Sequence, residues 1–136
     1  MLEGAFVLLV FLGTLISIFD MGQLLFIHQS MTERVRAAVR WGIVRPYDEA
    51  SIKNMVRFYQ PTNPGGAASF MNLTDAQVSV ELYTPVIGGS DPEEAANQRI
   101  IVKIQNYPFQ FFSPWIAQTY TNNHAVVESL PYEWRP

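Results

Sequence analysis

The chain has 136 residues, 49% of them hydrophobic, and a formal net charge of −3. This length suits one small domain with an appended segment rather than two full domains. Because 12 acidic residues outnumber 9 basic ones, we predict no nucleic-acid partner, and the lack of cysteine excludes disulfides, thiolate metal sites and thiol nucleophiles.

The first part of the chain predicts a long apolar helix. Residues 4–19 carry no charge, and the apolar character resumes after Asp20 as far as Ile27. A helix over Gly4–Ile27 would be about 36 Å long, enough to cross a bilayer core of about 30 Å. Three interpretations of this segment are open: a cleavable signal, a plain membrane anchor, and a helix that lies first in a membrane and later in a protein assembly. We favour the last, because a carboxylate such as Asp20 in an apolar stripe needs a partner.

Helix-forming residues continue beyond the apolar run to Trp41. Gly42 suits the end of a helix there. One stripe of this later portion is apolar or small at helical spacing and can pack on a globular head: Met31, Val35, Ala38 and Gly42. We therefore divide the chain into an N-terminal membrane and assembly helix, 1–42, and a small globular head, 43–136.

Small residues in the apolar run indicate where another helix could approach. Gly13 and Ser17 are four positions apart, and Gly22 extends the same option. Small side chains let two membrane helices pack closely. The alternative is that these glycines only lower the stability of the helix, by about 1 kcal/mol each.

The head predicts an α+β fold. A second helix is expected over Tyr47–Tyr59, with Pro46 in its first turn. Three short strands follow from period-two patterns around residues 78–82, 100–104 and 124–128, and in the last of these Ala125 and Val127 alternate with Val126. The expected fold is thus a long N-terminal hydrophobic helix, a second short helix and a small antiparallel sheet of three to four strands.

Two segments between the strands have distinct compositions. Residues 85–97 predict an exposed loop. Residues 106–123 are rich in aromatic side chains, among them Phe112 and Trp115, which favours a core lid or a subunit contact over a disordered linker.

Enzyme chemistry finds little support in the sequence. The two histidines, His28 and His124, have no metal-ligand spacing to other residues and are expected to be polar surface groups. Phosphate-cradling and nucleophile-elbow motifs are missing, and the glycine pairs 65–66 and 88–89 suit loops. We therefore expect no enzyme activity, no cofactor and no bound metal.

The first forty-odd residues resemble the TadE-like family of pilin-related proteins from tight-adherence secretion systems. Glu3 stands at the family's initial glutamate, and Asp20-Met21-Gly22 follows seventeen residues later, at the family's spacing. The stretch from Gln23 to Thr32 continues in register, and Arg36 and Arg40 match the two arginines of the alanine/arginine stretch. The resemblance implies a pilin-like structural subunit that is anchored by one pass in the bacterial inner membrane. It would then join identical subunits in a cell-surface filament with the help of a secretion or pilus assembly machinery.

Two carboxylates are the sharpest candidates for assembly contacts. In a bundle of identical helices Glu3 would need a cation, and the resemblance to pilins implies the α-amino group of a neighbouring subunit; the alternative is solvation in the headgroup layer. For Asp20 we expect a pairing with Arg34, Arg36 or Arg40 of an adjacent chain. The alternatives are that it emerges at the membrane edge, or that it accepts from Gln23 or Ser17. The full set of expected subunit contacts is Glu3, Phe6, Phe11, Gly13, Leu15, Ser17, Asp20, Gly22, Arg36 and Arg40.

The expected function is therefore that of a structural subunit of a pilus-like extracellular filament or tube, a homo-oligomer that polymerises through its N-terminal helix. The alternative is a minor pseudopilin or a single-pass membrane accessory protein of a tight-adherence type secretion system. An accessory protein would stay monomeric or small in detergent, whereas a subunit would form long regular particles.

Overall fold

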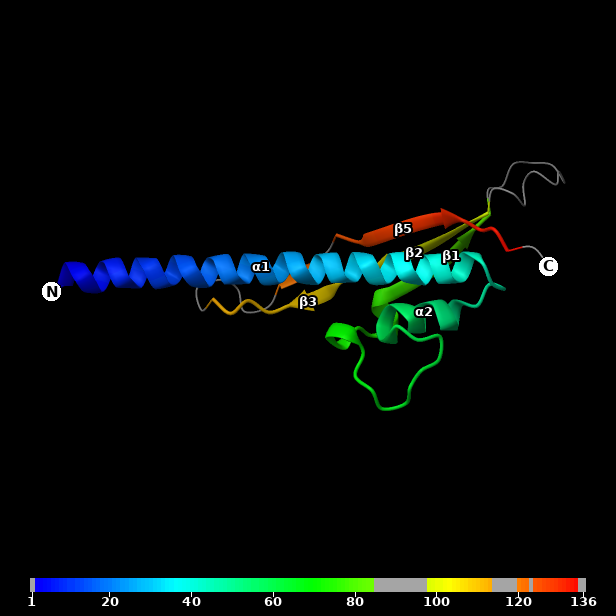
Figure 1. Ribbon diagram of the computed structural model, residues 1–136, viewed down its shortest axis with the longest axis horizontal. Coiled ribbons are helices and arrows are strands. Elements are labelled where there is room, and N and C mark those ends of the chain that lie inside the picture. The colour runs from blue at the N-terminus through cyan, green and yellow to red at the C-terminus, as the bar shows by residue number, and fades with distance from the viewer. Residues whose placement is uncertain (1, 85–97, 114–119, 123, 135–136) are drawn as a thin grey trace.

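The computed structural model describes residues 2–84, 98–113, 120–122 and 124–134. One helix, α1 (Leu2–Ile43, 42 residues), runs along most of the length of the molecule, and a small α+β head packs around its C-terminal half (Figure 1). At about 1.5 Å per residue α1 is about 63 Å long. The expected loop 85–97 and Trp115 lie outside the described residues.

Helix α1 ends at Ile43, one residue beyond Gly42, near which the sequence predicted its end. Gly42 is helical and buried, and a Cβ atom built on it would lie 2.9 Å from Cδ1 of Ile52. The glycine therefore lies in the last turn of α1 and also allows close packing between α1 and the second helix. The predicted stripe of Met31, Val35 and Ala38 is confirmed, because these side chains are fully buried.

The second helix, α2 (Glu49–Phe58), is shorter than predicted. Asp48 is its N-cap and accepts a hydrogen bond from the Ala50 backbone N–H at 3.1 Å, so Pro46 and Tyr47 precede the helix rather than open it. The C-cap is Tyr59, in the left-handed region at φ 61°. Its apolar stripe, Ile52, Met55 and Val56, is buried against α1 and the sheet.

A three-stranded antiparallel sheet forms the other side of the head. It contains β1 (Val78–Tyr83), β2 (Arg99–Ile104) and β5 (Val126–Pro131), in the order β1-β2-β5. The central strand β2 alternates as predicted, with Ile100, Val102 and Ile104 fully buried. In β5 the buried valine is Val126, and Val127 is exposed, so the apolar set expected for this strand was wrong by one residue.

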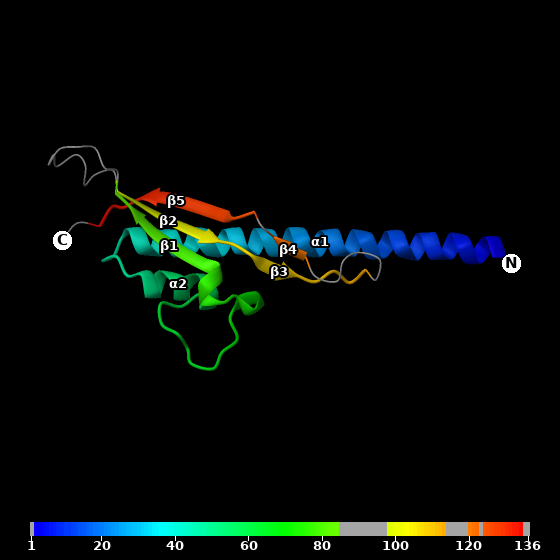
Figure 2. The ribbon, with the colours of Figure 1, turned by 180° about the vertical axis from the view of Figure 1, so that it is seen from behind.

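The aromatic segment contributes a second, two-stranded sheet of β3 (Tyr107–Phe109) and β4 (Tyr120–Asn122). Seen from behind, β3 and β4 lie along the middle of α1, nearer to the N-terminus than the main sheet (Figure 2). Tyr107 and Phe109 are buried members of the one core cluster, which confirms part of this segment as core. Two short 3-10 turns, η1 (Phe70–Asn72) and η2 (Asp75–Gln77), lead from α2 into β1.

Candidate functional site

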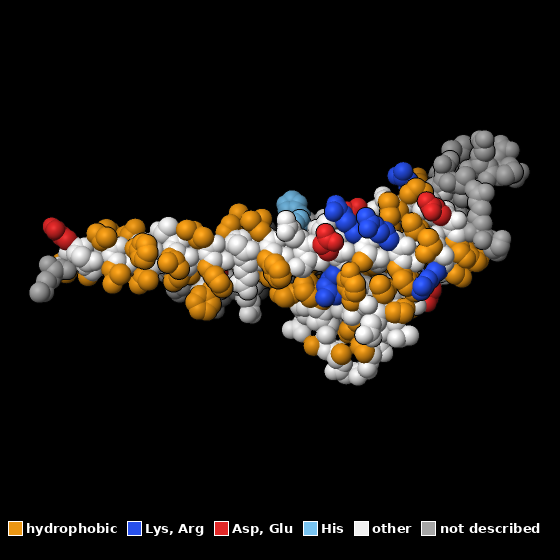
Figure 3. Space-filling view, viewed as in Figure 1, with side chains coloured by type: hydrophobic (Ala, Val, Ile, Leu, Met, Phe, Trp, Pro, Cys, Tyr) orange, Lys and Arg blue, Asp and Glu red, His pale blue; other side chains and the backbone are white. Residues whose placement is uncertain are grey.

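The first quarter of α1 is not covered by the described parts of the head. We call Leu2–Leu12 the bare segment, because every residue in it is exposed, including Phe6 at 69% and Phe11 at 60%. Apolar side chains cover most of its visible face (Figure 3). By length and composition α1 can cross a membrane, and its most apolar window is not buried by the head.

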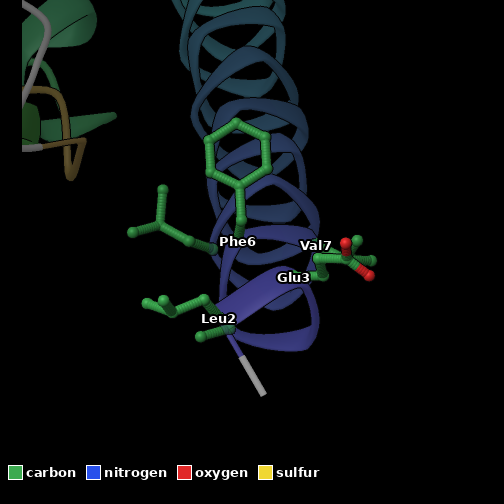
Figure 4. A pocket seen from close by; sticks show the side chains of 6 residues that line it. Leu2, Glu3, Phe6 and Val7 are labelled. Atoms are coloured by element: carbon green, nitrogen blue, oxygen red, sulfur yellow. The ribbon is translucent and has the colours of Figure 1, made fainter.

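The tip of the bare segment carries the single acidic side chain Glu3. It lies in the first turn, beside Val7 and on the other side of the helix from Leu2 (Figure 4). The shallow hollow drawn there is lined by this helix alone: Leu2, Glu3, Ala5, Phe6, Val7 and Leu9. Because one helix cannot enclose a ligand, this surface suits lipid or another helix rather than a small molecule.

One stripe of the following turns is partly covered. Gly13, Ile16 and Ser17 are half-buried, and Leu15 between them is exposed at 52%. The Ser17 hydroxyl donates to the carbonyl oxygen of Gly13 at 2.9 Å. Gly22 lies about half a turn away from Gly13 on the helix, at about 3.6 residues per turn, and a Cβ on it would meet no atom within 4 Å. The expected small-residue face is therefore divided: Gly22 is open to a neighbour, and Gly13 and Ser17 are partly covered in the monomer.

Asp20 is only 2% exposed, although it lies in the apolar half of α1. Its Oδ1 accepts from the backbone N–H of Phe112 at 2.8 Å, and its Oδ2 accepts from the backbone N–H of Ser113 at 2.9 Å and from the Ser113 hydroxyl. We call this arrangement the Asp20 clasp. A buried carboxylate needs such donors, and charge-assisted bonds of this kind are stronger than neutral ones.

The clasp replaces the partners that we expected for Asp20. Ser17 donates elsewhere, and two of the three candidate arginines are engaged within their own chain. Arg36 Nε lies 2.7 Å from Glu128 Oε1, and this hydrogen bond raises the pKa of the Arg36 guanidinium further above its usual range. Arg34 stacks at 4.0 Å over the Phe70 ring and donates to the Val56 carbonyl at 3.4 Å. Arg40 is exposed.

Sequence reasoning missed Phe112 and Ser113 as the partners of Asp20. The two parts of the clasp are 92 and 93 positions apart, and periodicity only relates residues within one element. The one available signal was the cost of an unpaired carboxylate in an apolar helix, which required a partner without naming it.

A further charged cluster lies on the surface of the head. Lys53 Nζ lies 2.7 Å from Glu49 Oε1 and 3.5 Å from Asp75 Oδ2. The pKa of Lys53 is raised, mainly by its hydrogen bond to Glu49. Within the described parts of the chain, no group of three or more His, Cys, Asp or Glu side chains could hold a metal ion.

Comparison with known proteins gives no match: neither a family model, nor a curated protein, nor a solved structure resembles this chain closely enough to report.

Proposed function

We propose that this protein is a structural subunit of a pilus-like extracellular filament or tube. It would be anchored in the bacterial inner membrane through α1 and then polymerise with identical subunits through the same helix. The observation that carries the proposal is the contrast within α1: Leu2–Leu12 is apolar and exposed nearly all round, whereas Met31–Gly42 completes the core of the head.

A helix that is apolar on all sides needs apolar surroundings. Lipid supplies them for a single chain, and the same helices of other subunits supply them in an assembly. A contact between the bare segment of one copy and a different surface of the next is heterologous, and such contacts generate open helical filaments when they do not close into a ring. The sequence pattern of Glu3–Gly42, which we likened to TadE-like proteins although no family model matches it, favours the same choice.

The continuity of α1 also supports assembly. The helix passes from the bare segment into the core of the head without a described break. The head is therefore fixed relative to the bare segment, and packing of the helices would set the spacing of the heads. A membrane anchor on its own needs no such rigid connection.

The proposed roles of the site residues follow from their positions. Phe6, Phe11 and Leu15 would pack between helices, and Gly22 would allow a close approach on its open side. Glu3 would require a cation from a neighbouring copy once lipid and water are displaced. Asp20, which is satisfied within its own chain, would shape the subunit rather than pair with a neighbour.

The test is to image material sheared from cells that make the full chain. Phe11→Asp and Leu15→Asp should abolish filaments and leave the head folded, because both side chains lie outside the core. Val44→Asp is the matched control: Val44 is 58% exposed and lies just beyond the other end of α1. Normal filament yield from Phe11→Asp, or wild-type protein that stays monomeric in detergent and never enters sheared fibres, would favour a single-pass accessory protein. A minor pseudopilin would appear in the fibres at low abundance.

A further inference from the structure

The level of the membrane boundary on α1 can be estimated from its charges. If Glu3 lies at one interface, the hydrocarbon core takes up about 20 residues, which places the other boundary near Gln23. The apolar run ends at Ile27, and His28 and Gln29 beyond it are exposed and polar. The turns between Asp20 and Ile27 therefore lie at the level of the second headgroup layer.

Large exposed apolar side chains gather at this level from two parts of the fold. Met21, Leu25 and Phe26 come from α1 and are 54% to 68% exposed. Phe112, which is 74% exposed, and Met71, which is 42% exposed, come from the head. We call these five residues the apolar collar.

The head part of the collar is held at this level by defined contacts. The backbone N–H of Phe112 donates directly to Asp20 Oδ1, and the Phe109 ring, three residues before Phe112, packs edge-on against Phe111 with 4.7 Å between centroids. Met71 and Phe112 line one groove together with Gln23 and Ile27 of α1. The head therefore reaches toward the N-terminus as far as the predicted lipid boundary.

We infer that the apolar collar is a membrane-docking surface, with Phe112 inserted at the boundary between headgroups and acyl chains. The partner is the lipid surface itself. The inference rests on the membrane-anchored stage of the proposed function and is independent of polymerisation.

Two observations favour lipid over a second copy of the chain. Three collar residues, Met21, Leu25 and Phe26, belong to the same helix as the candidate membrane span, and the clasp attaches Phe112 to that helix at Asp20. Its groove also mixes apolar side chains with the amides Gln23, Asn72 and Gln110. That mixture suits the interfacial layer, where apolar groups enter about 5–10 Å and polar groups stay hydrated.

The Asp20 clasp is the positioning device for this surface. Without it, a carboxylate would face lipid at the boundary, and the segment that carries Phe112 would lose its attachment to α1. With it, the carboxylate is covered and Phe112 is presented outward. Asp20 therefore acts on the membrane contact through Phe112 and Ser113.

The chain contains no cysteine, so single-cysteine variants can be labelled cleanly. We would attach an environment-sensitive fluorophore to Phe112→Cys, to Phe11→Cys in the middle of the span, and to Tyr83→Cys, which is 53% exposed in the head. Each full-length protein is reconstituted in phosphatidylcholine vesicles whose acyl chains carry bromine near the headgroup or near the chain end. The probe at 112 should lose about half of its emission to shallow bromines, the probe at 11 should be quenched most by deep bromines, and the probe at 83 by neither.

The clasp is tested in the same vesicles by adding Asp20→Asn to the labelled Phe112→Cys protein. Shallow quenching at 112 should fall toward the level at 83, while circular dichroism shows a folded head and the probe at 11 keeps its deep quenching. If the probe at position 112 is not quenched while the probe at position 11 is, the docking surface is overturned and the membrane anchor stands. If the probe at position 112 becomes shielded only in polymers, the collar contacts a second copy of the chain and lipid docking is overturned. If Asp20→Asn leaves the quenching at position 112 unchanged, the positioning role of the clasp is overturned. If 11 is also unquenched, the membrane-anchored stage fails and the inference fails with it.

Discussion

Truncation of Phe11 to alanine separates membrane anchoring from assembly. A phenylalanine buries about 150–250 Å² when it is fully covered. Since 60% of Phe11 is exposed in the single chain, about 120 Å² would remain to be covered in a filament. In an assay that starts from subunits in water this area corresponds to about 3 kcal/mol at about 25 cal/mol per Å². Because an alanine at position 11 keeps part of this burial free energy, we expect Phe11→Ala to weaken assembly by about 2 kcal/mol per subunit. This corresponds to about a 30-fold rise in the critical concentration for assembly.

The same substitution should hardly affect the other two properties of the chain. Phenylalanine contributes only about −0.3 to −0.6 kcal/mol to helix insertion, so Phe11→Ala should stay in the membrane fraction. The head should unfold at the same urea concentration, because Phe11 is outside the core cluster. The assay is pelleting of polymers over a concentration series, with electron microscopy of the pellets. A critical concentration within about threefold of wild type would refute the reasoning, since about 0.7 kcal/mol is too little for a packed aromatic side chain.

Three further predictions concern the head. Ile52→Ala should lower the free energy of unfolding by about 2–5 kcal/mol in urea titrations, because Ile52 is fully buried against Gly42. A smaller decrease would mean that Ile52 and Gly42 are not closely packed. Asp48→Ala should cost about 0.5–2 kcal/mol through loss of the α2 N-cap. The hydrogen bond from the Ser51 hydroxyl is the main cause that lowers the pKa of Asp48. The stabilisation of the fold by ionised Asp48 should therefore be complete above the ordinary carboxyl pKa and be lost as the pH falls through the lowered value. If Asp48→Ala and wild type lost stability in the same way at acid pH, this prediction would be wrong. Arg36→Ala should leave the thermal midpoint nearly unchanged, because the Arg36 side chain is 52% exposed, whereas a large shift would assign its ion pair a structural role.

The local features of the fold could be predicted from the sequence because they depend on short-range patterns. The apolar run predicted α1, and the spacing of Met31, Val35 and Ala38 predicted the face that the head covers. The alternation of Ile100, Val102 and Ile104 predicted the central strand. Each pattern records the geometry of a single helix or strand.

The parts that could not be predicted depend on contacts between distant segments. The end of α1 near Gly42 was predicted, but the packing of Gly42 against Ile52 is invisible until both helices are placed. Val126 and Val127 are both apolar, so only the pairing of β5 with β2 decides which one is buried. The partner of Asp20 lies on a loop after β3, and neither charge nor periodicity points to Phe112 and Ser113.

The most direct test of the central claim is the reactivity of the bare segment inside filaments. A single cysteine at Leu8, which is 57% exposed in the monomer, is compared with one at Val44 in intact, sheared surface filaments treated with a water-soluble maleimide. If identical helices replace lipid around the bare segment, Leu8→Cys should stay unlabelled until the filaments are dissociated, while Val44→Cys labels at once. Equal labelling of both positions, or filaments from which this polypeptide is missing, would contradict the proposal that α1 moves from lipid into contact with its own copies.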